Sequence, residues 1–411
     1  MAIAVGENIR RIDATEKVTG RALYASDVRL PGMAHAKILR SALPHACLRR
    51  IDTTKAAAIP GVLAVLTRDN LQVGAPHYGT YIKDQPIVAL DKVRYVGDIV
   101  AAVAATDEKT AEQAVHAIEV DYEELPVIHS VEEALSETAV LIHEENPARK
   151  DPDYGYGASL VRHDRSNIFY HFRYERGDSE KGFSESDHVL EETYFLSSAQ
   201  HYPLESHVSV ADFRGDEVTI WSGSQTPFPL RLEIARMFNL PLSHVRILVP
   251  YIGGGYGAKS GIKYEAVVVA LSRLAKKPVR LYVSAEETFK TLCDPSAKVT
   301  IKTGLKRDGT FVARHCEVYL DGGAYANSGP TVAERAGYRA HGPYRIPHVT
   351  TNCYCVYTNT VPGGAFRGFG GPQVSFAYES HLDMIARTLK LDPLELRLKN
   401  LLDKGDLYTA G

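Results

Sequence analysis

Near its end the chain reads Pro362-Gly-Gly-Ala-Phe-Arg-Gly-Phe-Gly-Gly-Pro-Gln373, so that five glycines surround one arginine and two phenylalanines. A surface turn alone does not require an arginine between two aromatic rings. Glycine lets the backbone approach a ligand closely, arginine attracts an anionic group, and an aromatic ring offers a stacking surface. The pattern therefore favours one wall of a ligand site over a glycine-rich loop with a solvated Arg367.

A second glycine-rich segment, Gly253-Gly-Gly-Tyr-Gly-Ala-Lys-Ser260, follows a predicted strand over residues 245–252 and precedes a predicted helix. Such a loop can direct backbone N–H groups at an anion, and a helix N-terminus would add a favourable dipole. A tight strand-to-helix turn remains the other interpretation. The loop also approaches the phosphate-binding pattern of nucleotide-binding proteins, although Ala258 stands where that pattern needs glycine. A nucleotide-binding module using residues 253–260 is therefore the alternative function.

Three further segments carry polar side chains that suit a site. The stretch Gln200-His-Tyr-Pro-Leu-Glu-Ser-His207 contains two histidines and a glutamate, which suit metal binding or acid–base chemistry, but a structural His–Glu pair is favoured. Gln225 follows the only tryptophan and suits either a hydrogen bond to a cofactor or an ordinary strand end. Arg335, considered alone, is consistent with a solvated surface charge.

Hydrophobic periodicity predicts two units joined by a polar linker. Residues 1–130 are predicted to be an α+β unit, with strands at 34–39, 61–66, 95–104 and 120–126 and a helix at 107–119 capped by Thr106. Residues 131–165 are polar and are expected to lie on the surface. The remainder is predicted to contain strands at 168–174, 189–195, 208–213 and 218–222 and helices at 229–238, 262–274 and 373–389.

Composition excludes several classes of protein. The 411 residues include 47 Lys and Arg against 50 Asp and Glu, which disfavours a nucleic-acid binder. The longest uncharged run, residues 346–366, is too polar for a membrane span, and residues 1–11 lack a signal peptide, so a cytoplasmic location is predicted. The five scattered cysteines suit reduced thiols and lack an iron–sulfur ligand pattern, which places any such cluster on another chain.

Taken together and in order, these motifs resemble the molybdenum-cofactor subunit of the xanthine dehydrogenase and aldehyde oxidase family. The set consists of Leu204-Glu205, Gln225, the 253–259 loop and Ala365-Phe-Arg-Gly-Phe-Gly-Gly-Pro-Gln373. Two earlier stretches, Thr19-Gly-Arg-Ala-Leu-Tyr-Ala-Ser-Asp27 and Tyr95-Val-Gly-Asp98, resemble the family's a/b hammerhead domain. The resemblance implies an α+β chain with that domain over residues 1–130, a linker over 131–165 and the first molybdopterin-binding domain over 166–411.

The resemblance also implies molybdopterin, in dinucleotide form, with molybdenum that no side chain ligates directly. The implied cofactor contacts are Gln225, Gly254, Gly255, Tyr256, Gly257, Ala365, Phe366 and Arg367. Arg367 would lie near the metal centre, Phe369 would stack on a flat substrate, and Glu205 would support the pocket. Both Arg367 and Phe369 are therefore candidate catalytic residues.

Departures from the family pattern bear on the substrate. The family's glutamine near the metal falls at Ala199, so Gln200, one place away, is the candidate catalytic residue in its stead. Ser260 stands where xanthine enzymes have a purine-binding glutamate, whereas Arg335 matches their substrate-binding arginine. The resemblance thus implies Phe369, Arg335 and Ser260 as substrate-binding residues. These changes disfavour xanthine and favour another N-heteroaromatic ring, including one with an anionic group for Arg335; an aldehyde remains open.

The family hydroxylates its substrates with oxygen from water, and this reaction needs a base. The family's base is a glutamate in a segment that this chain, which ends at Gly411, does not contain. The resemblance therefore implies the N-terminal half of a split subunit, arranged as in nicotinate dehydrogenase, with an exposed apolar face for its partner. The implied partners are a second molybdopterin-domain subunit, an FAD subunit and a 2Fe-2S subunit.

Overall fold

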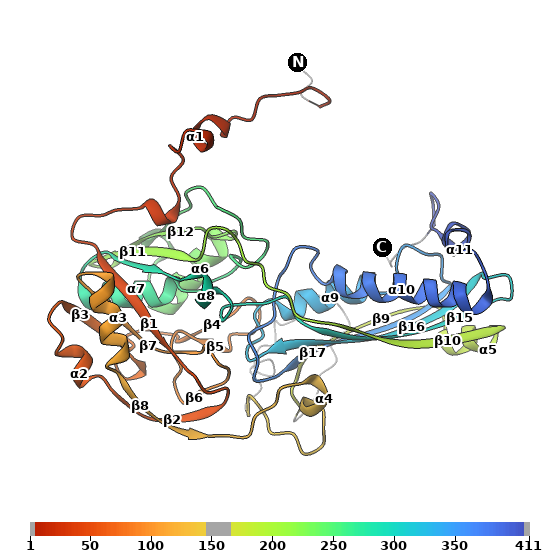
Figure 1. The fold of residues 1–411 in the computed structure, drawn as a ribbon, viewed down its shortest axis with the longest axis horizontal. Coiled ribbons are helices and arrows are strands. Elements are labelled where there is room, and N and C mark those ends of the chain that lie inside the picture. The colour runs from red at the N-terminus through yellow and green to blue at the C-terminus, as the bar shows by residue number, and fades with distance from the viewer. Residues whose placement is uncertain (1–4, 145–165, 407–411) are drawn as a thin grey trace.

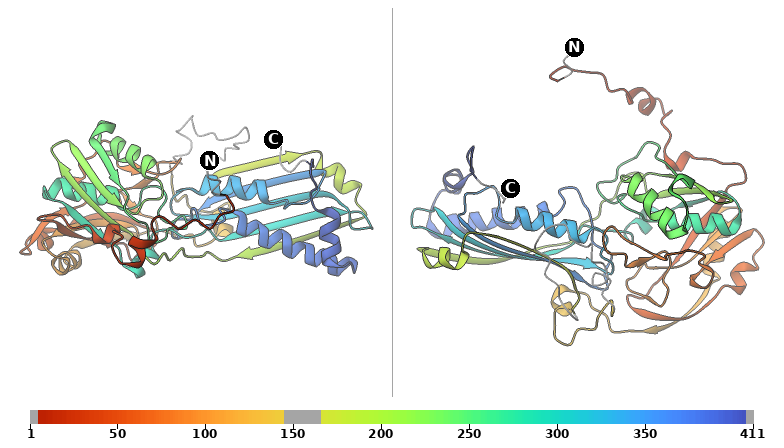
Figure 2. Two further views of the ribbon diagram at one scale, coloured as in Figure 1. Left: turned by 90° about the horizontal axis from the view of Figure 1, so that it is seen from above. Right: turned by 180° about the vertical axis from the view of Figure 1, so that it is seen from behind.

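The structure, a computed structural model, describes residues 5–144 and 166–406. Two lobes lie side by side, and each is built around one sheet (Figures 1 and 2). The predicted α+β class is confirmed by the mixture of helices and sheets in both lobes. None of the helices that the structure describes combines the length and the apolarity needed to span a bilayer.

The first lobe contains a seven-stranded sheet in the order β13-β12-β11-β14-β1-β7-β3. Its strands are β1 (Ala34–Arg40), β3 (Val62–Leu66), β7 (Ile99–Ala105), β11 (Val208–Arg214), β12 (Glu217–Ser222), β13 (Val245–Leu248) and β14 (Val279–Tyr282). β1 pairs in parallel with β14, with Ala34 opposite Val279, and antiparallel with β7. One continuous sheet thus contains strands from both sides of the boundary predicted near residue 130, and that boundary stays a prediction.

Three helices pack against this sheet: α3 (Glu108–His116), α6 (Pro227–Phe238) and α7 (Glu265–Ala275). Asp107, not the predicted Thr106, caps α3, because Asp107 has extended backbone and its carboxylate accepts a hydrogen bond from the Thr110 N–H at 2.9 Å. α7 begins three residues later than predicted, so residues 261–264 separate the glycine loop from the helix.

The second lobe is a five-stranded sheet in the order β10-β15-β16-β17-β9. Its strands are β9 (Ile168–Arg176), β10 (His188–Leu196), β15 (Ala297–Leu305), β16 (Phe311–Gly323) and β17 (His348–Tyr357). Only the β16–β17 pair is parallel, and α9 (Gly329–Arg339) makes the crossover between these two strands. α9 and α10 (Gly371–Leu389) lie along one face of the sheet and bury their apolar sides on it (Figure 1).

The remaining elements are short. Two small sheets are formed by β2 (Ala46–Asp52), β6 (Lys92–Val93) and β8 (Glu119–Glu124), and by β4 (His77–Tyr78) and β5 (Gln85–Pro86). The other helices are α1 (Ala14–Val18), α2 (Thr54–Ala57), α4 (Val131–Ala134), α5 (Ser179–Ser184), α8 (Ala285–Thr288) and α11 (Pro393–Asn400).

The start of the predicted linker lies on the surface but is anchored by a few buried side chains. Val131 and Ala134 of α4 are buried in the core of the second lobe, and Ile142 is fully buried there. Most polar residues of 131–144 are exposed, as expected of a surface segment, and the buried side chains attach the segment to the core. The assignment of these residues as a linker stays a prediction. Residues 145–165 lie outside the described part of the chain.

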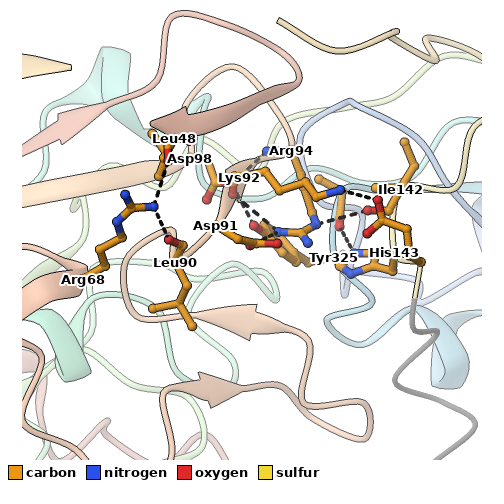
Figure 3. Close-up of polar contacts among 12 residues, drawn as sticks. Leu48, Arg68, Leu90, Asp91, Lys92, Arg94, Asp98, Ile142, His143 and Tyr325 are labelled. Carbon is orange, nitrogen blue, oxygen red and sulfur yellow. Dashed lines mark hydrogen bonds and ion pairs between the residues drawn. The ribbon is translucent and has the colours of Figure 1, made fainter. Parts of the chain in front are cut away.

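Buried polar contacts join the two lobes (Figure 3). Asp98 Oδ2 accepts hydrogen bonds from the Arg94 N–H at 3.0 Å and from the Tyr325 hydroxyl at 2.7 Å. The Arg94 Nε–H donates to the Ile142 carbonyl at 3.2 Å, and His143 Nε2 lies 2.9 Å from the Ala324 carbonyl. Burial lowers the pKa of His143 to about 3, so the ring is neutral and this nitrogen is the donor. Because hydrogen bonds to buried charges are among the stronger ones, these contacts fix the position of one lobe on the other.

Candidate functional site

The two glycine-rich loops, distant in sequence, meet in the structure. A Cβ atom on Gly257 would overlap the carbonyl group of Ala365. Gly257 also has a φ of +113°, which L side chains rarely adopt. Only glycine therefore allows this approach of residues 253–260 to residues 365–369.

Glu205 and Gln225 hold the first loop in place. Gln225 Oε1 accepts from the Gly257 N–H at 3.0 Å, and the Gln225 N–H donates to the Lys259 carbonyl at 2.9 Å. Glu205 Oε2 accepts from the Gly253 N–H at 2.8 Å and from Lys259 Nζ at 2.7 Å. The Lys259 and Glu205 side chains are only 3% and 10% exposed, so water has little access to the ion pair between them.

That ion pair counts against the alternative of a nucleotide-binding module. A phosphate-binding loop needs a lysine free to reach a phosphate and a helix that opens directly from the loop. Here Lys259 is buried against Glu205, and α7 begins only at Glu265.

Two histidines fix the loop backbones. His201 Nε2 lies 2.6 Å from the Ala365 carbonyl, and its ring packs on that of Phe366 with 4.6 Å between the centroids. His207 Nε2 lies 3.2 Å from the Ala258 carbonyl. Burial lowers the pKa of both histidines, that of His207 to about 3, so both are neutral donors. The prediction of a His–Glu pair is wrong, because Glu205 pairs with Lys259 instead. The sequence feature that could have indicated this pair is the lysine at the end of the glycine loop.

Several backbone N–H groups of the two loops have no acceptor. In the described part of the chain no hydrogen bond is donated by the amides of Gly254, Gly255, Tyr256, Phe366 and Arg367. Successive backbone amides without acceptors are groups that can bind an anion. Tyr256 and Phe369 have φ values of +54° and +49°, a strained conformation that is concentrated at functional sites.

A cavity of about 430 Å³ opens beside the second loop. Ser260, Ala365 and Phe369 line it together with a segment of the first lobe, residues 78–83. The half-buried Phe369 is held through its backbone, because Arg339 Nη1 donates to its carbonyl at 3.1 Å. Two of the predicted substrate-binding residues, Phe369 and Ser260, thus share one cavity.

Other predicted site residues lie elsewhere. Arg335 is exposed on α9 and does not line the cavity. Gln200 is half-buried, and its Nε2 is directed at the Phe289 carbonyl, 3.5 Å away. Arg367 is exposed between the loop amides and Phe369. The proposed roles of these three residues stay predictions.

Asp84, a residue that no sequence motif indicated, anchors one wall of the cavity. Its Oδ2 accepts from the Ala326 N–H at 2.7 Å and from the Tyr357 hydroxyl at 2.8 Å, whereas its buried Oδ1 has no partner among the described residues. Burial raises the pKa of this carboxyl to about 6. The segment 79–83 is therefore tied to the second lobe by a carboxylate that is costly to ionise.

Asp84→Asn should change how stability depends on pH. The folded-state pKa of about 6 lies above the ordinary value of 3.8, so the folded chain alone holds this proton between these values. The wild type should therefore lose up to about 3 kcal/mol of unfolding free energy relative to Asp84→Asn as pH rises from about 4 to 6.5. Denaturant unfolding across this range measures the difference, and parallel curves for the two proteins would contradict the prediction. Asp84→Ala, which removes the acceptor, should be less stable at every pH.

Comparison with known proteins identifies the class of the chain. Residues 161–401 match the family model of the molybdopterin cofactor-binding domain. Residues 19–126 match that of the aldehyde oxidase and xanthine dehydrogenase a/b hammerhead domain. The chain belongs to the xanthine dehydrogenase and aldehyde oxidase family, as its motifs indicate.

Two relatives and one solved structure show how similar this chain is to individual proteins. It is 38% identical over 399 residues to a probable xanthine dehydrogenase subunit of Bacillus subtilis, covering 97% of this chain and 51% of the relative. It is 35% identical over 410 residues to the nicotinate dehydrogenase large molybdopterin subunit of Eubacterium barkeri. That match covers 99% of this chain and 91% of the relative. The aldehyde oxidoreductase of Desulfovibrio gigas superposes with a TM-score of 0.87 at 29% identity, covering 97% of this chain and 43% of that one. The chain thus spans about half the length of the Bacillus subtilis relative.

Proposed function

We propose that the chain is the molybdenum-cofactor part of a multisubunit hydroxylase or dehydrogenase. Its substrate is an N-heteroaromatic compound or an aldehyde, the oxygen comes from water, and electrons pass to 2Fe-2S and FAD partner subunits. The observation that carries the proposal is the meeting of two glycine loops whose unpaired amides adjoin a cavity with an aromatic wall.

The residues present fit such a cofactor. In this proposal the metal is held by its organic cofactor, and no side chain of the chain ligates it directly. When bound, the molybdenum cofactor, in dinucleotide form, would supply the two-electron oxidation. The amides of Gly254, Gly255, Tyr256, Phe366 and Arg367 would bind its anionic atoms, and Gln225 keeps the first loop in position. The Arg367 guanidinium would add a positive charge beside them.

On the substrate side, the Phe369 ring would orient a flat molecule and Ser260 would line its pocket. Gln200 is retained as a candidate catalytic residue in place of the family's glutamine. The catalytic base is assigned to the partner with the second molybdopterin domain. Three apolar side chains near the loops favour such a partner, because Leu204, Phe228 and Leu232 are each more than half exposed. The division into residues 1–130, 131–165 and 166–411 is part of the same proposal.

Phe369→Ala tests the function directly. In the assembled complex we expect turnover to fall by roughly 100-fold, because a substrate that is not held in orientation loses about that much rate. Molybdenum content, measured by mass spectrometry, should stay unchanged, since the ring lines the cavity beyond the loop amides.

The matched control is Phe376→Ala, an exposed phenylalanine of α10, which should leave turnover as it is. Arg367→Ala should also lower turnover. An intact wild-type complex without molybdenum would refute the proposed function.

A further inference from the structure

The cavity beside Phe369 contains a buried cation that none of the motifs indicated. Lys263 lines the cavity and is only 8% exposed. Its Nζ donates to the Ser260 carbonyl at 2.7 Å and, more weakly, to the Ile262 carbonyl at 3.4 Å. These two backbone carbonyls are its hydrogen-bond acceptors among the described residues, and an ammonium group has three N–H donors.

No carboxylate neutralises Lys263 by an ion pair within the described residues. Glu265 is the acidic residue nearest in sequence, but its oxygens accept from the Ser222 hydroxyl at 2.7 Å and from the Lys263 backbone N–H at 2.8 Å. Burial lowers the pKa of Lys263 to about 8, against the raising influence of the Glu265 charge, so the ammonium group persists at neutral pH. A buried charge without a counterion is costly, and an anion in the cavity would offset that cost.

The second lysine of the cavity differs in this respect. Lys83 Nζ donates to Glu233 Oε1 at 2.7 Å, and its side chain is 34% exposed. Its charge is therefore paired and partly solvated. An anionic ligand would gain more from Lys263, because charges interact more strongly where water is excluded.

The remaining walls suit a flat ring. Pro229, Leu232 and the Phe369 ring are apolar, whereas Thr226 and Ser260 offer hydroxyl groups. A volume of about 430 Å³ lies within the range of sites for small organic molecules. The cavity thus combines space for an aromatic ring with one buried cation that forms no ion pair among the described residues.

We propose that Lys263 determines specificity, so that the cavity selects an aromatic heterocycle bearing a carboxylate, with the carboxylate bound to the Lys263 ammonium group. This inference rests on the proposed function, since it makes the cavity the substrate site. It moves the anion-binding role that the sequence suggested for Arg335 to a residue that lines the cavity.

Binding of two matched probes to the assembled complex tests the proposal. Pyridine-3-carboxylate and pyridine-3-carboxamide differ in charge but hardly in shape, and calorimetric titration gives the affinity of each. The wild type should bind the carboxylate more tightly. Lys263→Met should weaken carboxylate binding by roughly 10- to 100-fold, as for loss of a hydrogen bond to a charged group, and change carboxamide binding by less than about threefold.

Lys83→Met is the matched control, because it removes the same charge from the same cavity at a paired position. It should change the affinity for either probe by less than about threefold. The proposal is overturned if the wild type does not prefer the carboxylate, a result that needs no variant, or if the two lysine variants lose carboxylate binding equally.

Molybdenum analysis of the same samples separates the two proposals. Molybdenum without carboxylate preference would refute the role of Lys263 and leave the proposed function standing. A complex without molybdenum would refute the function itself.

Discussion

Replacing Gly257 with alanine is expected to abolish turnover and to leave the assembled complex without molybdenum. The new Cβ would overlap the Ala365 carbonyl, and the φ of +113° is unfavourable for alanine. The strained backbone alone costs about 1–3 kcal/mol, and relief of the overlap requires the two loops to separate. Because the proposed cofactor amides lie on both loops, separation removes the site. Metal analysis and turnover assays on the purified complex measure both effects.

Gly215→Ala is the control for backbone strain. Gly215 also has a positive φ, +63°, but a Cβ atom added there would meet no heavy atom within 4 Å. This variant should lose about 1–2 kcal/mol of stability and keep its molybdenum. If Gly257→Ala kept full metal content and turnover, the contact between the loops would not matter for the cofactor.

The second large effect is expected for Lys259→Met. Glu205 would then keep a buried charge with only the Gly253 amide as partner, since the ion pair is nearly dry. Removing one member of such a pair typically costs about 3–5 kcal/mol. Denaturant unfolding should show a loss of this size, and the purified complex should contain less molybdenum than the wild type.

The double variant Glu205→Gln, Lys259→Met separates the charge from the packing. Glutamine can still accept from the Gly253 N–H, so most of the stability lost in Lys259→Met should return. A double variant as unstable as the single one would mean that packing of the lysine stem, and not its charge, supports the loop.

Much of the fold could be predicted because its signals are local. Alternating or continuous apolar runs indicated β1, β7 and β11, and helical periodicity indicated α10. The glycine loops were also recognisable, since glycine at 257 and 368 marks backbone that other residues rarely adopt. These features depend on residues that are close together in the sequence, so the sequence alone is enough to predict them.

Contacts between distant residues could not be predicted in this way. Nothing in the residues around His201 indicates that its partner is the Ala365 carbonyl, and the same holds for Asp84 and the Ala326 amide. Lys263 was missed for a related reason, because the residues that share its cavity, such as Tyr78 and Phe369, are distant from it in the sequence. The motifs thus indicated which residues to examine and their roles stay predictions, whereas Asp84 and Lys263, whose surroundings are set by distant parts of the chain, carried no such signal.

The parallel pairing of β1 with β14 has a consequence for synthesis on the ribosome. About 240 residues separate these strands, so at about 5–20 residues per second β14 emerges roughly 12–50 s after β1. During that interval one edge of β1 lacks its partner strand, and such edges promote aggregation. The nascent chain should therefore depend on a chaperone until residue 282 has left the exit tunnel.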